Sequence, residues 1–155
     1  MQIHLCAVGQ RMPGWVSEGY QEYAKRLPRE CELVLREIAP GKRGKNADLD
    51  RVRNEEGERI LASLGRDDHV IALEVGGQAW STEQLAGKLQ HWLPSGQRIA
   101  LLVGGPEGLS EACRARASQL WSLSALTLPH PLVRVIVAEQ IYRAWSLLNR
   151  HPYHR

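Results

Sequence analysis

Short apolar runs alternate along this chain with longer segments in which apolar residues recur every three or four positions. The short runs stop at glycine, proline or charged residues, which is typical of buried strands, and they predict strands at 2–8, 31–38, 69–75 and 98–103. The helical spacing predicts helices at 15–27, 46–64, 82–93, near 110–118 and at 132–148. Ser81 and Gln84 have the spacing of a capping box, and Pro131 suits a first helical turn.

This alternation of strands and helices predicts an α/β fold with a mainly parallel sheet flanked by helices. Three of the strand candidates are nearly continuous apolar runs, as expected for strands that are buried on both faces. The sequence shows no internal repeat, low-complexity tract or linker. We therefore expect residues 1–155 to form a single domain.

The last predicted helix, 132–148, carries apolar residues around nearly its whole circumference. A helix of this kind is buried on all sides. In so short a chain, the pattern favours a homodimer in which a second copy covers part of this helix. The alternative is a central core helix that the chain covers by itself. The five tryptophans are expected in the core rather than in contact with nucleic-acid bases.

The composition is that of an ordinary globular protein, with 43% hydrophobic and 24% charged residues. No apolar stretch approaches the roughly 20 residues of a membrane helix, and the N-terminus lacks the features of a secretory signal, so we expect a cytoplasmic protein without a membrane partner. Cys6, Cys31 and Cys113 are widely spaced and outside any CxxC motif. They are expected to be buried as small apolar residues, and no metal site is expected.

The chain has 20 basic and 17 acidic residues, a net charge of +3 that by itself identifies no partner. The cations gather in two places, the basic loop (residues 41–45) and the C-terminal tail (residues 150–155). Together they favour a polyanion such as RNA, although charged loops are often only solvated. The residues concerned are Lys42, Arg43, Lys45, Arg150, His151, Tyr153 and Arg155.

In an open α/β sheet, ligands bind beyond the carboxyl ends of the strands. Three predicted loops leave such ends, after Glu74, after Val103 and around 122–131. The second loop reads VGGPEGLS, and its glycines allow close approach of backbone to a ligand. It lacks the features of a P-loop or a dinucleotide fingerprint, and Glu107 disfavours phosphate. A neutral or cationic ligand fits better, and an ordinary turn is the alternative.

Four segments in this order, GKRGKNAD, VGGPEGLS, WSLSALTLPHPLVRVIVAEQIYRA and NRHPYHR, closely resemble the ribosomal RNA large-subunit methyltransferase H family of the SPOUT class. The resemblance covers the whole chain. It implies a C-terminal trefoil knot and S-adenosyl-L-methionine as methyl donor. It also implies methylation of N3 of a pseudouridine in large-subunit (23S) ribosomal RNA, by a homodimer acting on the assembled ribosome.

The resemblance also implies a donor pocket and, less specifically, catalytic groups. The donor pocket would comprise Leu73, Gly104, Gly105, Leu123, Ser124, Ala125, Leu126, Thr127 and Leu128. Methyl transfer requires in-line positioning and a deprotonated acceptor nitrogen, which calls for a cation or a base. The candidates are Arg134, Glu139, Arg143 and His154.

Each of these candidates has an alternative interpretation. Glu139 and Arg143 have the spacing of an ordinary helical ion pair. Arg134 interrupts an apolar face and is expected to meet either RNA or a carboxylate, because a buried unpaired cation is costly. The tail that holds His154 could be an idle terminus. For the chain as a whole, the alternatives are a SPOUT methyltransferase of transfer RNA and a non-catalytic ribosome assembly factor.

Overall fold

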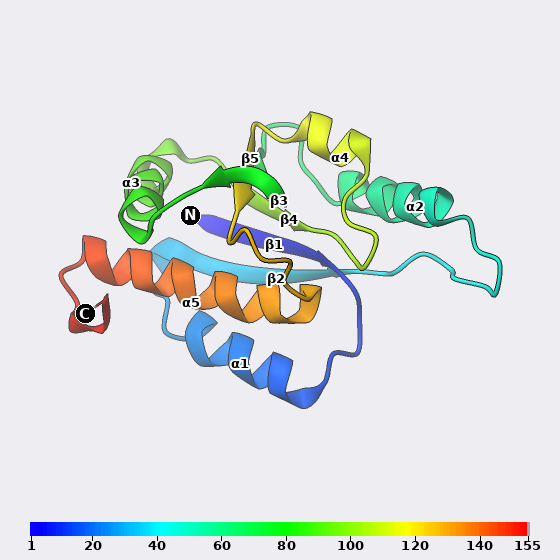
Figure 1. Cartoon of the computed structure of the whole chain (residues 1–155). Helices are drawn as coiled ribbons and strands as arrows, with labels where there is room; N and C mark the ends of the chain where they lie inside the picture. Colours follow the sequence, from blue (N-terminus) through cyan, green and yellow to red (C-terminus); the bar gives the residue numbers. More distant parts are fainter. Residues whose placement is uncertain (155) are drawn as a thin grey trace.

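The computed structural model describes residues 1–154, and its centre is a five-stranded sheet in which all strands run parallel (Figure 1). The strand order is β2-β1-β4-β3-β5. The strands are β1 (Gln2–Val8), β2 (Glu32–Ile38), β3 (His69–Ala79), β4 (Ile99–Val103) and β5 (Gln119–Ser122). The helices are α1 (Gly14–Ala24), α2 (Leu49–Ala62), α3 (Thr82–Trp92), α4 (Glu111–Arg116) and α5 (His130–Leu148). The prediction of a mainly parallel α/β sheet is confirmed.

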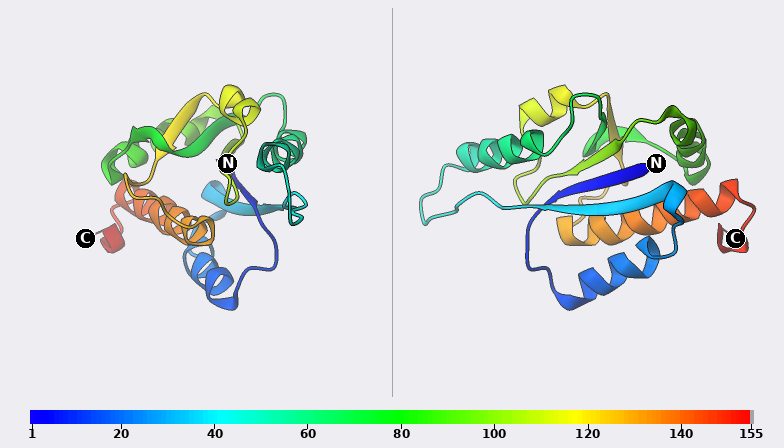
Figure 2. Two further views of the ribbon diagram at one scale, coloured as in Figure 1. Left: turned by 45° about the vertical axis from the view of Figure 1, so that its right-hand side comes forward. Right: turned by 180° about the vertical axis from the view of Figure 1, so that it is seen from behind.

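Helices cover both faces of this sheet, as Figures 1 and 2 show. On one face, α1, α3 and α5 pack over Ile3, Leu5 and Leu101. On the other face, α2 and α4 pack over Cys6 and Leu102. Successive residues of β1 therefore enter opposite cores, which explains why the strands read as continuous apolar runs. The three cysteines are buried and free, as predicted.

The predicted elements match the observed ones except near the sheet edge. β3 continues four residues past its predicted end, because its register shifts between Leu73 and Gln78, both of which pair with Trp121. Gly77 permits this shift, since a Cβ there would lie 2.6 Å from the backbone of Leu120. β5, which begins at Gln119 and ends at Ser122, is not among the predicted strands.

The expectation that all five tryptophans are buried is wrong. Trp92 and Trp121 are buried, but Trp15 at the start of α1 is 57% exposed. Trp80, between β3 and α3, is only half-buried. Within residues 1–154, no helix is long and apolar enough to cross a membrane, and no cluster of three or more His, Cys, Asp or Glu side chains could hold a metal ion.

Helix α5 is largely covered within one chain. No residue between Pro131 and Leu148 is fully exposed, because α1 and α3 flank the helix and the sheet lies beneath it. This arrangement supports the central-helix alternative for most of the circumference. Leu132 and Ile136 are only half-buried, so some apolar area remains at the start of the helix.

The capping box at α3 is present as predicted. The Ser81 hydroxyl accepts a hydrogen bond from the Gln84 N–H at 3.1 Å, and the Gln84 carboxamide accepts one from the Ser81 N–H at 2.8 Å. Ser81→Ala is expected to lower the free energy of unfolding by about 1 kcal/mol, because the Gln84 N–H loses its acceptor at the start of α3. Urea denaturation measures this, with Ser17→Ala on the exposed face of α1 as control. Equal effects of the two substitutions would contradict the prediction.

Candidate functional site

A cavity of about 460 Å³ lies at the carboxyl ends of β3, β4 and β5; we call it the carboxyl-end cavity. Three segments meet there: residues 73–75 after the regular part of β3, the glycine loop (residues 104–109), and the apolar loop (residues 123–129). Eight of the nine residues predicted for the donor pocket line this cavity, and Ala125 does not. Residues distant in sequence are thus brought to one site.

The glycine loop is both a tight turn and a wall of the carboxyl-end cavity. The N–H of Gly108 donates to the Gly105 carbonyl at 2.9 Å, and Gly108 has a φ of +78°, which favours glycine. A Cβ on Gly104 would lie 2.5 Å from the Gly108 carbonyl carbon. A side chain on Gly105 would point away from the cavity, toward Val8 and Glu56. The loop therefore closes only with glycine at position 104.

The cavity lining is mostly apolar and offers few charges. Apolar side chains dominate its walls, with Ser124 and Thr127 as hydroxyl groups. The Ser124 hydroxyl accepts a hydrogen bond from the Leu126 N–H at 3.0 Å, which fixes the turn of the apolar loop. Among the described lining residues, Glu74 is the one carboxylate, and none is Lys or Arg. Such a lining accepts an apolar or weakly cationic ligand.

His130, the first residue of α5, also lines the cavity. Burial, followed by the positive charges of Arg134 and Arg43, lowers the pKa of His130 below its ordinary value of 6.5, and Glu56 opposes this in part. The imidazole is therefore uncharged at neutral pH. The cavity thus presents no positive side chain to a ligand at that pH.

The basic loop lies beside the glycine loop. Arg43 forms ion pairs with Glu107 and, at 3.4 Å, with Glu56. The hydrogen bond from Arg43 lowers the pKa of Glu107, so this carboxylate is held as an anion by the basic loop and does not line the cavity. We expected Glu107 to disfavour anions in the pocket. It instead has a structural role, as the partner of Arg43. Lys42 and Lys45 are exposed.

Sequence reasoning missed Glu56 on α2. Its side chain is 1% exposed, and its Oε2 accepts a hydrogen bond from the Gly41 N–H at 2.9 Å. Its Oε1 has no hydrogen-bond partner among residues 1–154. Glu56 therefore anchors the basic loop from below. The available signal was a carboxylate on the apolar stripe of the predicted helix.

Arg134 is buried on α5, with 1% of its surface exposed. Its guanidinium donates to Glu37 at 2.8 Å and to the Gly9 carbonyl at 2.9 Å. The expectation that it meets a carboxylate is confirmed. These contacts hold α5 against the ends of β1 and β2. This region borders the cavity.

Glu139 and Arg143 form the helical ion pair that their spacing suggested. The guanidinium Nε of Arg143 donates to Glu139 at 2.8 Å, and both side chains are partly buried. Glu139 lies six residues after the cavity-lining Val133, about 9 Å along the helix axis. The pair therefore sits near the cavity without lining it.

Residues 152–154 of the tail form a short helical turn that packs at the far end of α5 (Figure 1). The Tyr153 ring lies 4.7 Å from the Tyr142 ring, and the Arg143 guanidinium lies 5.0 Å from the Tyr153 centroid. His151 also contacts Tyr142, at 6.2 Å between centroids, and Arg150 is exposed. The predicted RNA-binding Arg155 lies outside the described residues. His154 is half-buried beside this cluster.

The tail does not line the cavity of its own chain. Tyr142, on which Tyr153 packs, lies nine residues after the cavity-lining Val133, about 13 Å along the axis of α5. The structure therefore does not bring His151, Tyr153 and His154 together with the predicted donor residues within one copy.

Comparison with known proteins agrees with this architecture. Residues 1–154 match a family model described as predicted SPOUT methyltransferase. The chain belongs to the SPOUT methyltransferase family. A probable methylase family protein from Haemophilus influenzae Rd KW20 has the same fold, with a TM-score of 0.56 over 96% of this chain and 67% of that one, at 13% sequence identity.

Curated relatives match from end to end. A protein of Methylococcus capsulatus named ribosomal RNA large subunit methyltransferase H is 64% identical over 100% of both chains. Proteins of the same name from Hahella chejuensis and Thioalkalivibrio sulfidiphilus are 63% and 61% identical, over 100% of this chain and 99% of theirs. The resemblance drawn from the four sequence segments is thereby confirmed.

Proposed function

We propose that this chain transfers a methyl group from S-adenosyl-L-methionine to N3 of a pseudouridine in large-subunit (23S) ribosomal RNA, acting as a homodimer on the assembled ribosome. The observation that carries the proposal is the carboxyl-end cavity, where the glycine loop and the apolar loop of a SPOUT methyltransferase meet. The names of relatives at 64% and 63% identity support the RNA substrate.

The residues of the cavity fit this donor. The apolar loop offers a slot for adenine, with backbone groups free to hydrogen-bond its edge. Gly104 allows the tight turn that forms one wall of the cavity, since a Cβ there would lie 2.5 Å from the Gly108 carbonyl carbon. The absence of Lys and Arg from the described lining suits a positively charged ligand. When bound, S-adenosyl-L-methionine supplies an electrophilic methyl group on a sulfonium.

The donor affinity is expected to depend on pH through His130. Its pKa is lowered, so the imidazole gains its proton only below the ordinary value of 6.5. That proton places a positive charge beside the sulfonium. The affinity for the donor should therefore be constant above pH 7 and fall by about tenfold at acidic pH. Calorimetry from pH 8 to pH 5 measures this. His130→Gln should flatten the profile and His91→Gln should not; an unchanged profile in His130→Gln would contradict the assignment.

On the RNA side, the chain offers the basic loop and the tail. Lys42 and Lys45 are exposed next to the glycine loop, where they can face phosphates. The tail residue Tyr153 packs on Tyr142, about 13 Å along α5 from the cavity-lining Val133, and it does not line the cavity of its own chain. We therefore assign contact with the reacting nucleotide to the tail of a second copy, in keeping with the homodimer.

Uncovered apolar surface near the cavity gives that second copy a place to bind. Gly19 of α1 faces Val135 of α5, where an added Cβ would lie 3.3 Å from the Val135 side chain, and Trp15 lies one turn earlier on α1, 57% exposed. Leu126 of the apolar loop is 73% exposed. Exposed aromatic and aliphatic side chains of this kind commonly mark subunit contacts.

The groups that can act on the N3 proton are Glu139, Arg143 and the tail of a second copy. His154 is one of the residues of that tail. Arg143 bridges Glu139 and the Tyr153 ring, so the ion pair and the tail form one connected group. A cation there stabilises the anionic nitrogen, and a carboxylate or imidazole accepts its proton. Arg134 is buried, and its two terminal nitrogens donate to Glu37 and to the Gly9 carbonyl, so it serves as a positioning residue.

The decisive experiment combines the purified protein and the donor with ribosomes from cells that lack the gene, followed by mass spectrometry of the RNA. One methyl group on N3 of a pseudouridine in the large-subunit RNA is expected. Methylation of transfer RNA instead would show a different SPOUT substrate. Co-sedimentation with ribosomes without any methyl transfer would show an assembly factor.

A further inference from the structure

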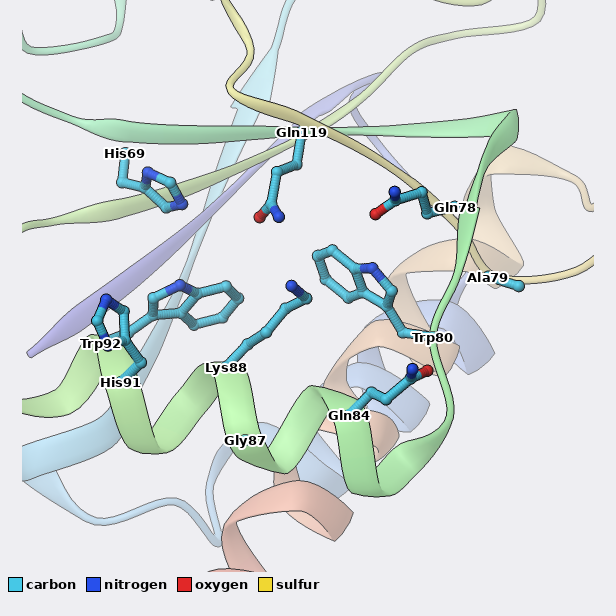
Figure 3. A pocket seen from close by; sticks show the side chains of 10 residues that line it. All are labelled: His69, Gln78, Ala79, Trp80, Gln84, Gly87, Lys88, His91, Trp92 and Gln119. Atoms are coloured by element: carbon cyan, nitrogen blue, oxygen red, sulfur yellow. The ribbon is translucent and has the colours of Figure 1, made fainter.

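A second hollow, of about 840 Å³, lies between α3 and the strands β3 and β5; we call it the edge groove (Figure 3). β5 is the last strand of the sheet, so the groove lies along the sheet edge. None of its lining residues lines the carboxyl-end cavity. Its volume is within the range of ligand sites in proteins. The edge groove is therefore a separate feature with its own chemistry.

Aromatic rings form two walls of the edge groove. Trp80 stacks on Trp121, with centroids 4.9 Å apart and an interplanar angle of 16°, so its ring is held in place. Trp92 is 4% exposed, and the His69 ring lies 6.2 Å from it. Trp121 also lines the carboxyl-end cavity, so the stacked pair connects the two sites. The groove thus offers preformed flat surfaces.

Lys88 is the one Lys or Arg among the described lining residues of the edge groove. It projects from α3 with its ammonium 4.4 Å from the Trp80 centroid (Figure 3). None of the described lining residues is Asp or Glu. Burial, followed by the neighbouring His91 and Lys88, lowers the pKa of His69, so this imidazole is uncharged at neutral pH. The uncompensated ammonium of Lys88 makes the groove complementary to an anion.

Two amide side chains point into the same space. Gln119 on β5 and Gln78 on β3 extend into the groove in Figure 3. Within residues 1–154, neither carboxamide forms a hydrogen bond to another group. Amides of this kind can donate to and accept from the edges of nucleobases. Stacking surfaces, free amides and an uncompensated cation are the combination that binds unpaired nucleotides.

We propose that the edge groove binds an unpaired nucleotide of the substrate RNA, at a place separate from the reacting nucleotide. The proposal rests on the proposed function, which makes RNA the substrate. The base stacks on Trp80, Gln78 and Gln119 contact its edge, and Lys88 moves from the ring to a phosphate. A second copy of this chain, with its net charge of +3, complements the cationic groove poorly. The groove contributes affinity and leaves the chemical step unchanged.

The test compares Lys88→Glu with Lys25→Glu, which makes the same charge change at an exposed position directly after α1, where Lys25 pairs with Glu22. Binding of a fluorescent ten-nucleotide oligouridylate and the KM for ribosomes are measured. Lys88→Glu is expected to weaken both by about tenfold, with kcat at saturating ribosomes within about twofold of the parent protein. Lys25→Glu should change neither by more than about twofold. Equal effects of the two substitutions would overturn the proposal.

Trp80→Leu tests stacking without changing charge, and it is expected to weaken oligouridylate binding by about tenfold while donor binding is retained. If the ribosome proves not to be the substrate, the oligouridylate titrations still decide whether the groove binds RNA. Size-exclusion chromatography with light scattering follows the oligomeric state. If Lys88→Glu dissociates a dimer and leaves RNA affinity unchanged, the groove is a subunit contact and the proposal is wrong.

Discussion

A Gly104→Ala variant is expected to lose nearly all affinity for the methyl donor and, with it, methyl transfer. The added Cβ would lie 2.5 Å from the Gly108 carbonyl carbon and 2.8 Å from the Leu109 nitrogen. These are backbone atoms of the same turn, so the turn must open. An opened turn displaces the wall against which the donor rests. A cost of about 3 kcal/mol corresponds to roughly a hundredfold loss of affinity.

Calorimetric titration with S-adenosyl-L-methionine measures this effect. The matched control is Gly14→Ala, where no atom lies within 4 Å of the added Cβ. Both variants should elute at the same volume and melt cooperatively, because the glycine loop is at the edge of the core. Normal donor affinity in a folded Gly104→Ala protein would show that the donor binds elsewhere.

The sequence predicted best those elements whose pattern is local. β1 was predicted with its observed bounds, because each of its residues enters one of two apolar cores. β5 was not, because Gln119 and Ser122 carry no strand pattern and the strand exists through its pairing with β3. Likewise, the glycines at 76 and 77 read as the end of β3, whereas the chain resumes pairing after them. Tertiary pairing decided both cases.

The carboxyl-end cavity was predictable to the same degree. Eight of the nine residues that the resemblance assigned to the donor pocket line it, because all but Leu73 lie in two contiguous segments. The sequence did not predict contacts between residues that are far apart in the chain. Arg43 and Glu107 are 64 residues apart, and Arg134 and Glu37 are 97 apart. The sequence shows that Arg134 needs a partner, but several carboxylates satisfy that requirement equally well.

The edge groove could not have been predicted at all. His69, Trp80, Lys88 and Gln119 come from two strands, a helix and a connecting segment, and they form no motif. Taken alone, each residue is explained as the end of a strand, a buried aromatic ring or part of a solvent-exposed helix face. They form one groove because β3 bends and brings Trp80 over Trp121. A property of assembled surfaces is visible only in three dimensions.

Arg134→Met is expected to lower the free energy of unfolding by about 3 kcal/mol. The methionine fills much of the volume but donates no hydrogen bond. The ion pair to Glu37 is lost, and the carbonyls of Val8 and Gly9 lose a buried donor. Each buried acceptor left without a partner costs about 1–3 kcal/mol. Denaturation in urea, followed by circular dichroism, measures the change.

The control is Arg143→Met, the same substitution on the same helix. Arg143 forms an ion pair four residues from Glu139 with both side chains partly exposed, so its loss should cost about 0.5 kcal/mol. The two variants also separate positioning from catalysis. If Arg134 acts by holding α5 to the ends of β1 and β2, osmolytes that restore folding should restore most of the methyl transfer. A fully stable Arg134→Met protein without methyl transfer would instead place this guanidinium among the catalytic residues, because the only property lost would be its charge.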